Sequence, residues 1–363
     1  MSPSDDELPD IDPWESVAVR GLRRGVNLSH WYAQVYTGPG YVAEHFDTAM
    51  TRSDLELIVS MGFDHVRFPF AFEQVTSTAG DAAEFIARLR REVERLHALG
   101  LAVVVDAHPE LALRDALAKD AAARTAFVAD WRRVAGALAD LPTETTAFEI
   151  LNEPSLGDAR VWEEIVERAL EALTSAAPQH SVVVSGDGYS DVAELLHLDP
   201  SVLRENVVLN LHHYEPVAIS HQSAYFTPPD TRDIKGLEYP VEGANVRELL
   251  AGTLAPEARA RVKEFVRAGW SRGSFDAVFA AARVFAGARP LTCNEFGVYR
   301  GAPRGTRLRW TRDAVAAMEA QGIGWTVWDY GGDFAVTTRV SGIREPDLGM
   351  LVALGLRQED TGA

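Results

Sequence analysis

The sequence alternates between short apolar runs and longer amphipathic segments. The apolar runs are continuous, as in LAVVVDA at residues 101–107, which is typical of parallel strands covered on both faces. The segments between them carry apolar residues at helical spacing, for example Phe85, Leu89 and Val93, and that segment ends at Gly100. The pattern predicts eight strands, which lie within residues 26–28, 63–70, 101–110, 147–153, 181–189, 206–216, 290–297 and 322–334.

Eight strands that alternate with helices predict an α/β protein, a single (β/α)8 TIM barrel, because parallel strands need crossover helices and eight strands close the sheet. An open doubly wound sheet is the alternative, but neither SGDGYS nor YGGDF is the glycine-rich turn into a helix that a dinucleotide site needs. We expect an elaborated loop at residues 215–245, after the sixth strand. Residues 1–20 are acidic and lack periodicity, so we expect a flexible lead-in before one domain at residues 21–363. Predicted helices cover residues 51–61, 82–99, 115–138, 161–176, 256–268, 274–286, 307–320 and 346–356.

The charge balance narrows the range of partners. Asp and Glu number 53 against 35 Lys and Arg, which gives a formal net charge of -18 and a surface that repels polyanions. We therefore expect no nucleic-acid partner and no contact with anionic membranes. Lys119, Lys235 and Lys263 are the only lysines and none ends a predicted strand, which argues against Schiff-base chemistry.

The single cysteine and the amino terminus give evidence about the cellular compartment of the protein. With Cys293 as its one cysteine, the chain cannot form an internal disulfide. Cys293 and Glu295 are two residues apart on one predicted strand, so they share a face, and Cys293 is expected deeper in the barrel core. The amino terminus is acidic, whereas a signal peptide begins with basic and then apolar residues. No apolar run approaches the ~18 residues of a membrane-spanning helix. We expect a cytoplasmic protein, or a secreted one if a leader has been removed; the oligomeric state is left open.

Two Asn-Glu pairs stand at the ends of predicted strands. Asn152-Glu153 precedes Pro154, which cannot continue a strand ladder, and Asn294-Glu295 ends the run PLTC. In a parallel barrel the carboxyl ends of all strands surround one mouth, so these carboxylates can face each other. Cleavage of a glycosidic bond needs one carboxylic acid to protonate the leaving oxygen and one carboxylate to attack or stabilise the anomeric carbon. Glu153 and Glu295 can supply both.

Further polar and aromatic residues end other strands. They are Arg67 on the second, His108 in DAH on the third, His212-His213-Tyr214 on the sixth and Trp328 on the eighth. Together with LNEP and NEFG, this set resembles glycoside hydrolase family 5, the cellulase family of clan A, over about residues 22–335. The joint pattern is specific, whereas NEP alone would be weak.

The resemblance implies a retaining mechanism, with Glu153 as acid/base and Glu295 as nucleophile, their carboxyl groups ~5–5.5 Å apart. Arg67 and Tyr214 would keep Glu295 ionised through charge and hydrogen bonding. A negative neighbour and partial burial would raise the pKa of Glu153. No metal and no cofactor are implied.

The resemblance also gives roles to the supporting residues. Asn152 is suited to bind the sugar 2-hydroxyl. His108 and His212 would contact sugar hydroxyls or the acid/base. Trp328 would form the apolar floor of the subsite. Trp31, after the first strand, is a further candidate, and both tryptophans have the alternative of a place in the core. The pair His212-His213 could suggest a metal, but adjacent strand residues point to opposite faces and no Cys/His cluster joins them.

We therefore expect a retaining β-glycoside hydrolase, most similar to endo-β-1,4-glucanases, that acts on β-glucan or a related oligosaccharide. If residues 215–245 block the cleft, an intracellular exo-acting β-glucosidase or β-mannosidase is the alternative. A barrel that binds carbohydrate without cleaving it is a third hypothesis. The presence of both glutamates argues against it, because binding alone needs neither.

Overall fold

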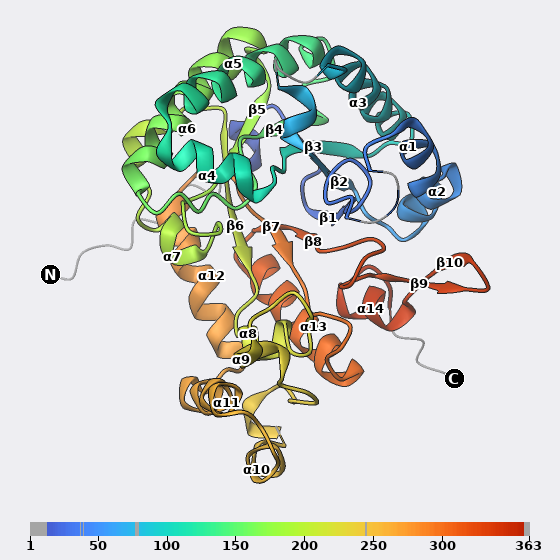
Figure 1. The fold of residues 1–363 in the computed structure, drawn as a ribbon, viewed down its shortest axis with the longest axis vertical. Helices are drawn as coiled ribbons and strands as arrows, with labels where there is room; N and C mark the ends of the chain where they lie inside the picture. Colours follow the sequence, from blue (N-terminus) through green and yellow to red (C-terminus); the bar gives the residue numbers. More distant parts are fainter. Residues whose placement is uncertain (1–12, 37, 39, 77–79, 244, 359–363) are drawn as a thin grey trace, which may run out of the picture.

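The structure is a closed barrel of eight parallel strands surrounded by helices (Figure 1). The computed structural model describes residues 13–36, 38, 40–76, 80–243 and 245–358. Neighbouring strands pair in chain order, and β8 pairs with β1 to close the sheet. The strands are β1 (Arg24–Asn27), β2 (His65–Phe70), β3 (Ala102–Ala107), β4 (Thr146–Glu149), β5 (Ser181–Val184), β6 (Val207–His213), β7 (Leu291–Phe296) and β8 (Gly324–Val327). The predicted (β/α)8 TIM barrel is confirmed.

Crossover helices cover the outside of the barrel with an apolar stripe. In α3, Phe85, Leu89 and Val93 are buried, as their helical spacing predicts. The expected helix at residues 115–138 is two helices, because Asp120 caps the second by accepting a hydrogen bond from the Ala122 N–H at 2.8 Å. The crossover helices are α1 (Ala43–Ala49), α2 (Arg52–Ser60), α3 (Ala82–His97), α4 (Leu111–Lys119), α5 (Ala121–Leu138), α6 (Ala159–Ala176), α7 (Val192–Leu195), α11 (Pro256–Ala268), α12 (Arg272–Ala286) and α13 (Arg304–Ala320), and α14 (Leu348–Ala353) follows the last barrel strand.

The amino-terminal end of the barrel is closed by residues that we expected in the flexible lead-in. A short 3-10 helix, η1 (Pro13–Ser16), brings Trp14 and Val17 against barrel residues such as Val104. Val19 is also buried there, and its N–H donates to Ser181 Oγ at 3.2 Å. The lead-in prediction is therefore wrong for residues 13–20, whose apolar side chains cover the barrel end. Residues 1–12 lie outside the described part of the chain.

The segment after β6 is elaborated, as predicted, but it is not a structureless loop. It contains α8 (Val217–Ser220), α9 (Pro229–Arg232), η4 (Val241–Gly243) and α10 (Val246–Ala251), and it lies at the end of the molecule where α10 and α11 project (Figure 1). Buried Ile234, Leu237 and Tyr239 anchor it. The Gln222 side chain accepts from the Leu237 N–H at 2.8 Å and donates to its carbonyl at 2.9 Å.

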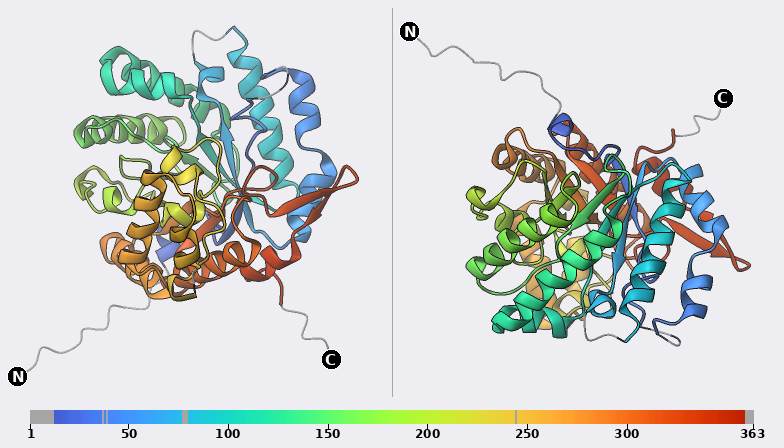
Figure 2. Two further views of the ribbon diagram at one scale, coloured as in Figure 1. Left: turned by 60° about the horizontal axis from the view of Figure 1, so that its bottom comes forward. Right: turned by 90° about the horizontal axis from the view of Figure 1, so that it is seen from above.

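The segment after β8 carries a hairpin that the hydrophobic pattern did not predict. Strands β9 (Thr337–Val340) and β10 (Ile343–Pro346) pair antiparallel and project from the barrel (Figures 1 and 2). The strands are mostly exposed, so no apolar run marks them. Among the described helices, none is both long enough and apolar enough to span a membrane.

Candidate active site

A buried arginine organises the mouth of the barrel. Arg67, on β2, is fully buried and contacts three carboxylates: Nη1 lies 2.6 Å from Glu295 Oε1, Nε 2.8 Å from Glu149 Oε2, and Nη2 2.9 Å from Asp106 Oδ2. Burial by itself lowers the pKa of Arg67, but the three carboxylates raise it well above its ordinary value. The guanidinium therefore stays charged and fixes the positions of acidic groups from three other strands.

Glu295 receives hydrogen bonds on both carboxylate oxygens. Besides the Arg67 contact at Oε1, the Tyr214 hydroxyl donates to Oε2 at 2.9 Å. Burial and the negative Glu295 raise the pKa of Tyr214 well above its ordinary value, so Tyr214 remains a donor. Glu295 itself is only 5% exposed. Two donors, one of them charged, therefore hold both oxygens of the Glu295 carboxylate in place.

Glu153 lies in a more open position, four residues after β4 ends. Its side chain is 24% exposed, and its φ of 44° is in the left-handed region, which is strained for a residue with a side chain. The Arg114 Nη1 donates to the Glu153 carbonyl oxygen at 3.2 Å and so holds this turn. Burial of the carboxyl group raises its pKa, opposed by His108, Arg114 and Arg67.

His212 connects the two glutamates. Its Nδ1 lies 3.1 Å from Glu153 Oε1 and 3.8 Å from Glu295 Oε2. Burial lowers the pKa of His212 to about 4, so the ring is neutral near pH 7. In one tautomer of the neutral ring, Nδ1 accepts a hydrogen bond from the protonated carboxyl group of Glu153. In the other tautomer, the Nδ1–H donates a hydrogen bond to the ionised carboxylate.

His108, Asn152 and Trp328 lie beside this pair. Asn152 Oδ1 accepts from Arg67 Nη2 at 2.8 Å, and Nδ2 lies 3.3 Å from His108 Nε2. His108 Nδ1 is 3.0 Å from Asp106 Oδ2, and burial lowers the pKa of His108 to about 3. The Trp328 ring stacks over the His108 ring at 5.9 Å between centroids. The structure thus brings together every expected site residue discussed so far.

Comparison with known proteins bears directly on this arrangement. The family described as cellulase (glycosyl hydrolase family 5) matches residues 30–334. The chain belongs to this family. It is therefore a glycosidase that acts on O-glycosyl bonds, and its substrate is a carbohydrate.

Several relatives in this family are similar to the chain. Endoglucanase C of Acetivibrio thermocellus is 27% identical over 340 residues, which cover 85% of this chain and 91% of the relative. Cellodextrinase A of Ruminococcus flavefaciens is 28% identical, over 58% of this chain and 63% of its own length. Among solved structures, a mutant form of Thermotoga maritima Cel5A in complex with cellobiose has a TM-score of 0.76 at 22% identity, and the match covers 95% of this chain and 99% of that one.

Trp31 was also expected in the site, but it lies apart from this cluster. It is 1% exposed, stacks on Phe68 at 5.1 Å and donates from Nε1 to the Phe46 carbonyl at 2.9 Å. Its ring therefore packs in the core between β2 and α1. The expectation of a substrate contact is wrong for Trp31, because the turn at His30, with a φ of 60°, directs the following residues into the core.

The sequence interpretation missed the layer of residues beneath the two glutamates. Glu149 receives both Nε and Nη2 of Arg67, and Asn294 Nδ2 donates to its Oε2 at 2.9 Å. Asn27 Oδ1 accepts from Arg67 Nη1 at 3.0 Å. A signal was present: Glu149 interrupts the apolar run AFEIL, and a charge inside a buried strand needs a partner.

Among the described residues, one group of side chains could also hold a metal ion, namely Glu153, His212 and Glu295. Each offers one donor atom, and these atoms lie within 4.8 Å of one another. A divalent cation could use one imidazole and two carboxylates, but the same atoms already hydrogen-bond to one another or to Arg67 and Tyr214. The expectation of no metal and no cofactor stays a prediction.

Proposed function

We propose that this family 5 glycosidase is a retaining endo-β-1,4-glucanase that hydrolyses β-glucan chains or oligosaccharides by double displacement. Glu295 is the nucleophile and Glu153 the acid/base. The carrying observation is their spacing, since each offers an oxygen within 4.8 Å of the other's. Retaining enzymes hold the two carboxyl groups about 5–5.5 Å apart, whereas inverting enzymes need about 6.5–9.5 Å to fit a water. The spacing supports direct attack by a carboxylate.

The first step forms a glycosyl-enzyme. A Glu295 oxygen attacks the anomeric carbon while Glu153 gives its proton to the glycosidic oxygen, and the leaving sugar departs as an alcohol. In the second step Glu153 takes a proton from water, the water oxygen attacks the anomeric carbon, and the bond to Glu295 breaks. Each step inverts this carbon, so the product keeps the β configuration.

The environments of the two glutamates support this division of roles. Arg67 and Tyr214 both donate to Glu295, which favours the ionised form that a nucleophile needs. Glu153 has a pKa raised by burial and a neutral His212 at 3.1 Å, which favours the protonated form that an acid needs. A carboxylate held by two donors, next to a carboxyl group whose pKa is raised, is suited to one nucleophile and one acid.

Three neighbouring residues would hold the sugar between the glutamates. Arg67 fixes Asn152 Oδ1, and the Asn152 amide hydrogen that does not face His108 would bind the 2-hydroxyl. Asp106 orients His108, whose Nε2 faces Asn152. Trp328 would support the apolar face of the pyranose, whose C–H bonds complement an aromatic plane.

Exposed aromatic residues favour a chain substrate over a single sugar. Tyr36 follows β1, Tyr189 follows β5, and Tyr225 and Phe226 follow β6; each is more than half exposed. Loops that follow strands lie on the catalytic face of such barrels. Aromatic rings on several sides of this face suit sugars bound beyond the point of cleavage.

The second candidate is exo action on short glycosides, as by a β-glucosidase or β-mannosidase. The helices α8, α9 and α10 after β6 favour it if they close one end of the cleft, and one relative is named a cellodextrinase. We would compare aryl β-glucoside, β-mannoside and β-cellobioside with soluble β-glucan. Endo action predicts preference for cellobioside and an early fall in glucan viscosity. Preference for a monosaccharide glycoside would favour exo action, and no cleavage at all would leave only carbohydrate binding.

A further inference from the structure

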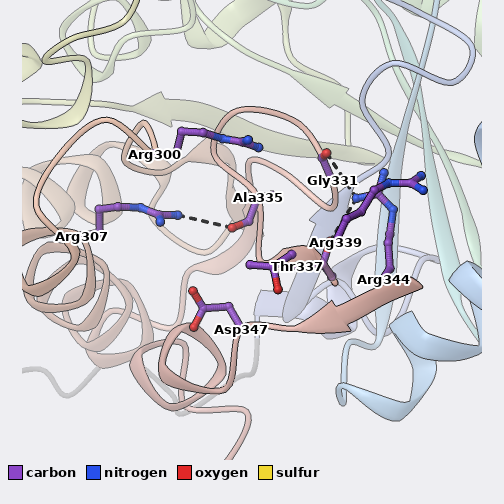
Figure 3. A pocket seen from close by; sticks show the side chains of 9 residues that line it. Arg300, Arg307, Gly331, Ala335, Thr337, Arg339, Arg344 and Asp347 are labelled. Atoms are coloured by element: carbon purple, nitrogen blue, oxygen red, sulfur yellow. Dashed lines mark hydrogen bonds between the residues drawn. The ribbon is translucent and has the colours of Figure 1, made fainter. Parts of the chain in front are cut away.

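The segment that follows β8 lines an arginine-rich cavity. The cavity has a volume of about 320 Å³ and its basic lining residues are Arg300, Arg307, Arg339 and Arg344. Arg300 and Arg307 enter from the side of α13, and Arg339 and Arg344 from the side of the β9–β10 hairpin (Figure 3). Four guanidinium groups around one cavity are unusual for a chain with a formal net charge of -18.

The acidic groups nearby leave part of this positive charge uncompensated. Asp347, the acid that lines the cavity, is held at 2.6 Å and 2.7 Å by both terminal nitrogens of Arg304, which is outside the lining set. Asp333 lies 3.5 Å from Arg300, and Asp54 lies 3.3 Å from Arg344.

Arg307 and Arg339 are the unpaired cations of the cavity. Among the described residues, no carboxylate lies within ion-pair distance of either. Arg307 is 9% exposed, and within the described part of the chain its side chain donates to the carbonyls of Val298 and Ala335, each at 3.3 Å. Burial and the neighbouring Arg304 and Arg300 lower the pKa of Arg307, against the opposite effect of Asp347 and Asp329. A buried cation without a carboxylate at ion-pair distance is costly, and a bound anion would reduce that cost.

The arginines also hold the backbone that separates this cavity from the active site. Arg344 Nη1 donates to the Gly331 carbonyl at 3.3 Å, Arg300 donates to the Gly332 carbonyl, and Arg307 to that of Ala335. A Cβ at position 331 would lie 2.1 Å from Arg344 Nη1, so a larger residue there would displace the end of the Arg344 side chain. The same segment carries Phe334, whose ring packs edge-on against Tyr214 at 5.9 Å.

We propose that this cavity binds a small, multiply charged oxyanion of the phosphate class, which bridges Arg307 and Arg339 and fixes residues 329–335 behind the active site. Planar guanidinium groups match the oxygens of such anions in paired hydrogen bonds. The anion is free in solution rather than a substituent of the glycan, because residues 331–335 lie between the cavity and Tyr214.

The test uses the full chain, inorganic phosphate as the probe and sodium chloride at equal ionic strength as the reference. Phosphate is expected to raise the Tm beyond the effect of chloride, because a ligand that binds only the folded state stabilises it. Calorimetry should give a Kd that weakens about tenfold in Arg339→Gln. Among the described residues, the exposed Arg339 side chain makes one hydrogen bond, to the Gly342 carbonyl, so the loss of this side chain should leave the fold intact. Arg95→Gln, which removes a charge on α3, should bind phosphate like the wild type.

Amide hydrogen exchange of the wild type gives a readout that needs no variant. Phosphate is expected to slow exchange within residues 329–347 and to leave the rest of the chain unchanged. No Tm rise beyond that of chloride, equal phosphate affinity in Arg339→Gln, or protection confined to another part of the chain would each overturn the proposal. Hydrolytic activity is not used, so the outcome is independent of the proposed glucanase function.

Discussion

Arg67 Nη1 lies 2.6 Å from Glu295 Oε1, and the remaining nitrogens of the same guanidinium contact Glu149 and Asp106. One buried cation is thus shared by three carboxyl groups that come from three strands. Removing one partner of such a cluster leaves the others buried and uncompensated. Stability and catalysis therefore depend on the same side chain.

Two substitutions of Arg67 separate its charge from its shape. Arg67→Met should lose about 3–5 kcal/mol of unfolding free energy, because the carboxylates lose their counter-charge. Arg67→Lys should be more stable than Arg67→Met but lose at least about 100-fold in kcat, because an ammonium group cannot reproduce the planar fork. Denaturant unfolding and kcat measure the two effects. A stable Arg67→Met or a fully active Arg67→Lys would contradict this account.

The roles of the two glutamates can be separated by leaving group. Glu295→Gln should lose at least about 1,000-fold in turnover on every substrate, because no nucleophile remains. Glu153→Gln should lose turnover on glucan but retain much more on a dinitrophenyl β-cellobioside, whose leaving group needs no proton. The matched control Glu171→Gln, an exposed change on α6, should behave like the wild type. The reverse pattern between the two glutamates would mean that their roles are exchanged.

The alkaline limit of activity should follow Glu153. Its protonated form is required, and burial raises its pKa, so kcat/KM should fall only above the ordinary glutamate value of about 4.3. Arg114 lowers the pKa of Glu153, so Arg114→Gln should move this limit to higher pH. The measurement is kcat/KM against pH for both proteins on a glycoside with a poor leaving group. A limit moved to lower pH in Arg114→Gln would contradict the assignment of the acid.

His213 should make the protein sensitive to acid. Its ring is buried among aromatic residues, 5.1 Å from Phe279, and burial lowers its pKa to about 4. The group contributes full stability above its unfolded pKa of about 6.5, and this is lost as pH falls toward 4. His213→Phe should therefore lose about 2 kcal/mol less unfolding free energy than the wild type between pH 7 and 4.5. Equal losses would refute this, and His197→Phe, at an exposed position, should match the wild type.

Much of the barrel could be predicted because most strands contain an apolar run that is followed by glycine, proline or polar residues. Glu153 and Glu295 could be found because Asn-Glu ends two such runs. The contact of Arg67 with Glu149 could not, because it joins residues 82 positions apart that lie on β2 and β4, two strands separated by β3. Periodicity assigns residues to a face of a strand but does not say which side chains meet across a barrel.

The remaining errors have local causes. The β9–β10 hairpin has exposed strands without an apolar run, although Ser341 and Gly342, both with positive φ, form its short turn and a Ser-Gly pair is a turn signal. The acidic composition of residues 1–20 led to the prediction of a flexible lead-in, although Trp14 and Val17 pack against the barrel end. Trp31 could be assigned to neither core nor site, because the backbone turn at His30 decides its direction.

The most direct test of double displacement is the anomeric configuration of the first product, followed by proton NMR during hydrolysis of a β-cellobioside in D₂O. An oxygen of Glu153 lies within 4.8 Å of one of Glu295, which is shorter than the spacing of about 6.5–9.5 Å that an inverting enzyme needs for a water between its carboxylate and the sugar. We predict that the β-anomer appears first and that the α-anomer follows only by mutarotation. An α-anomer formed from the start would contradict the roles proposed for Glu153 and Glu295.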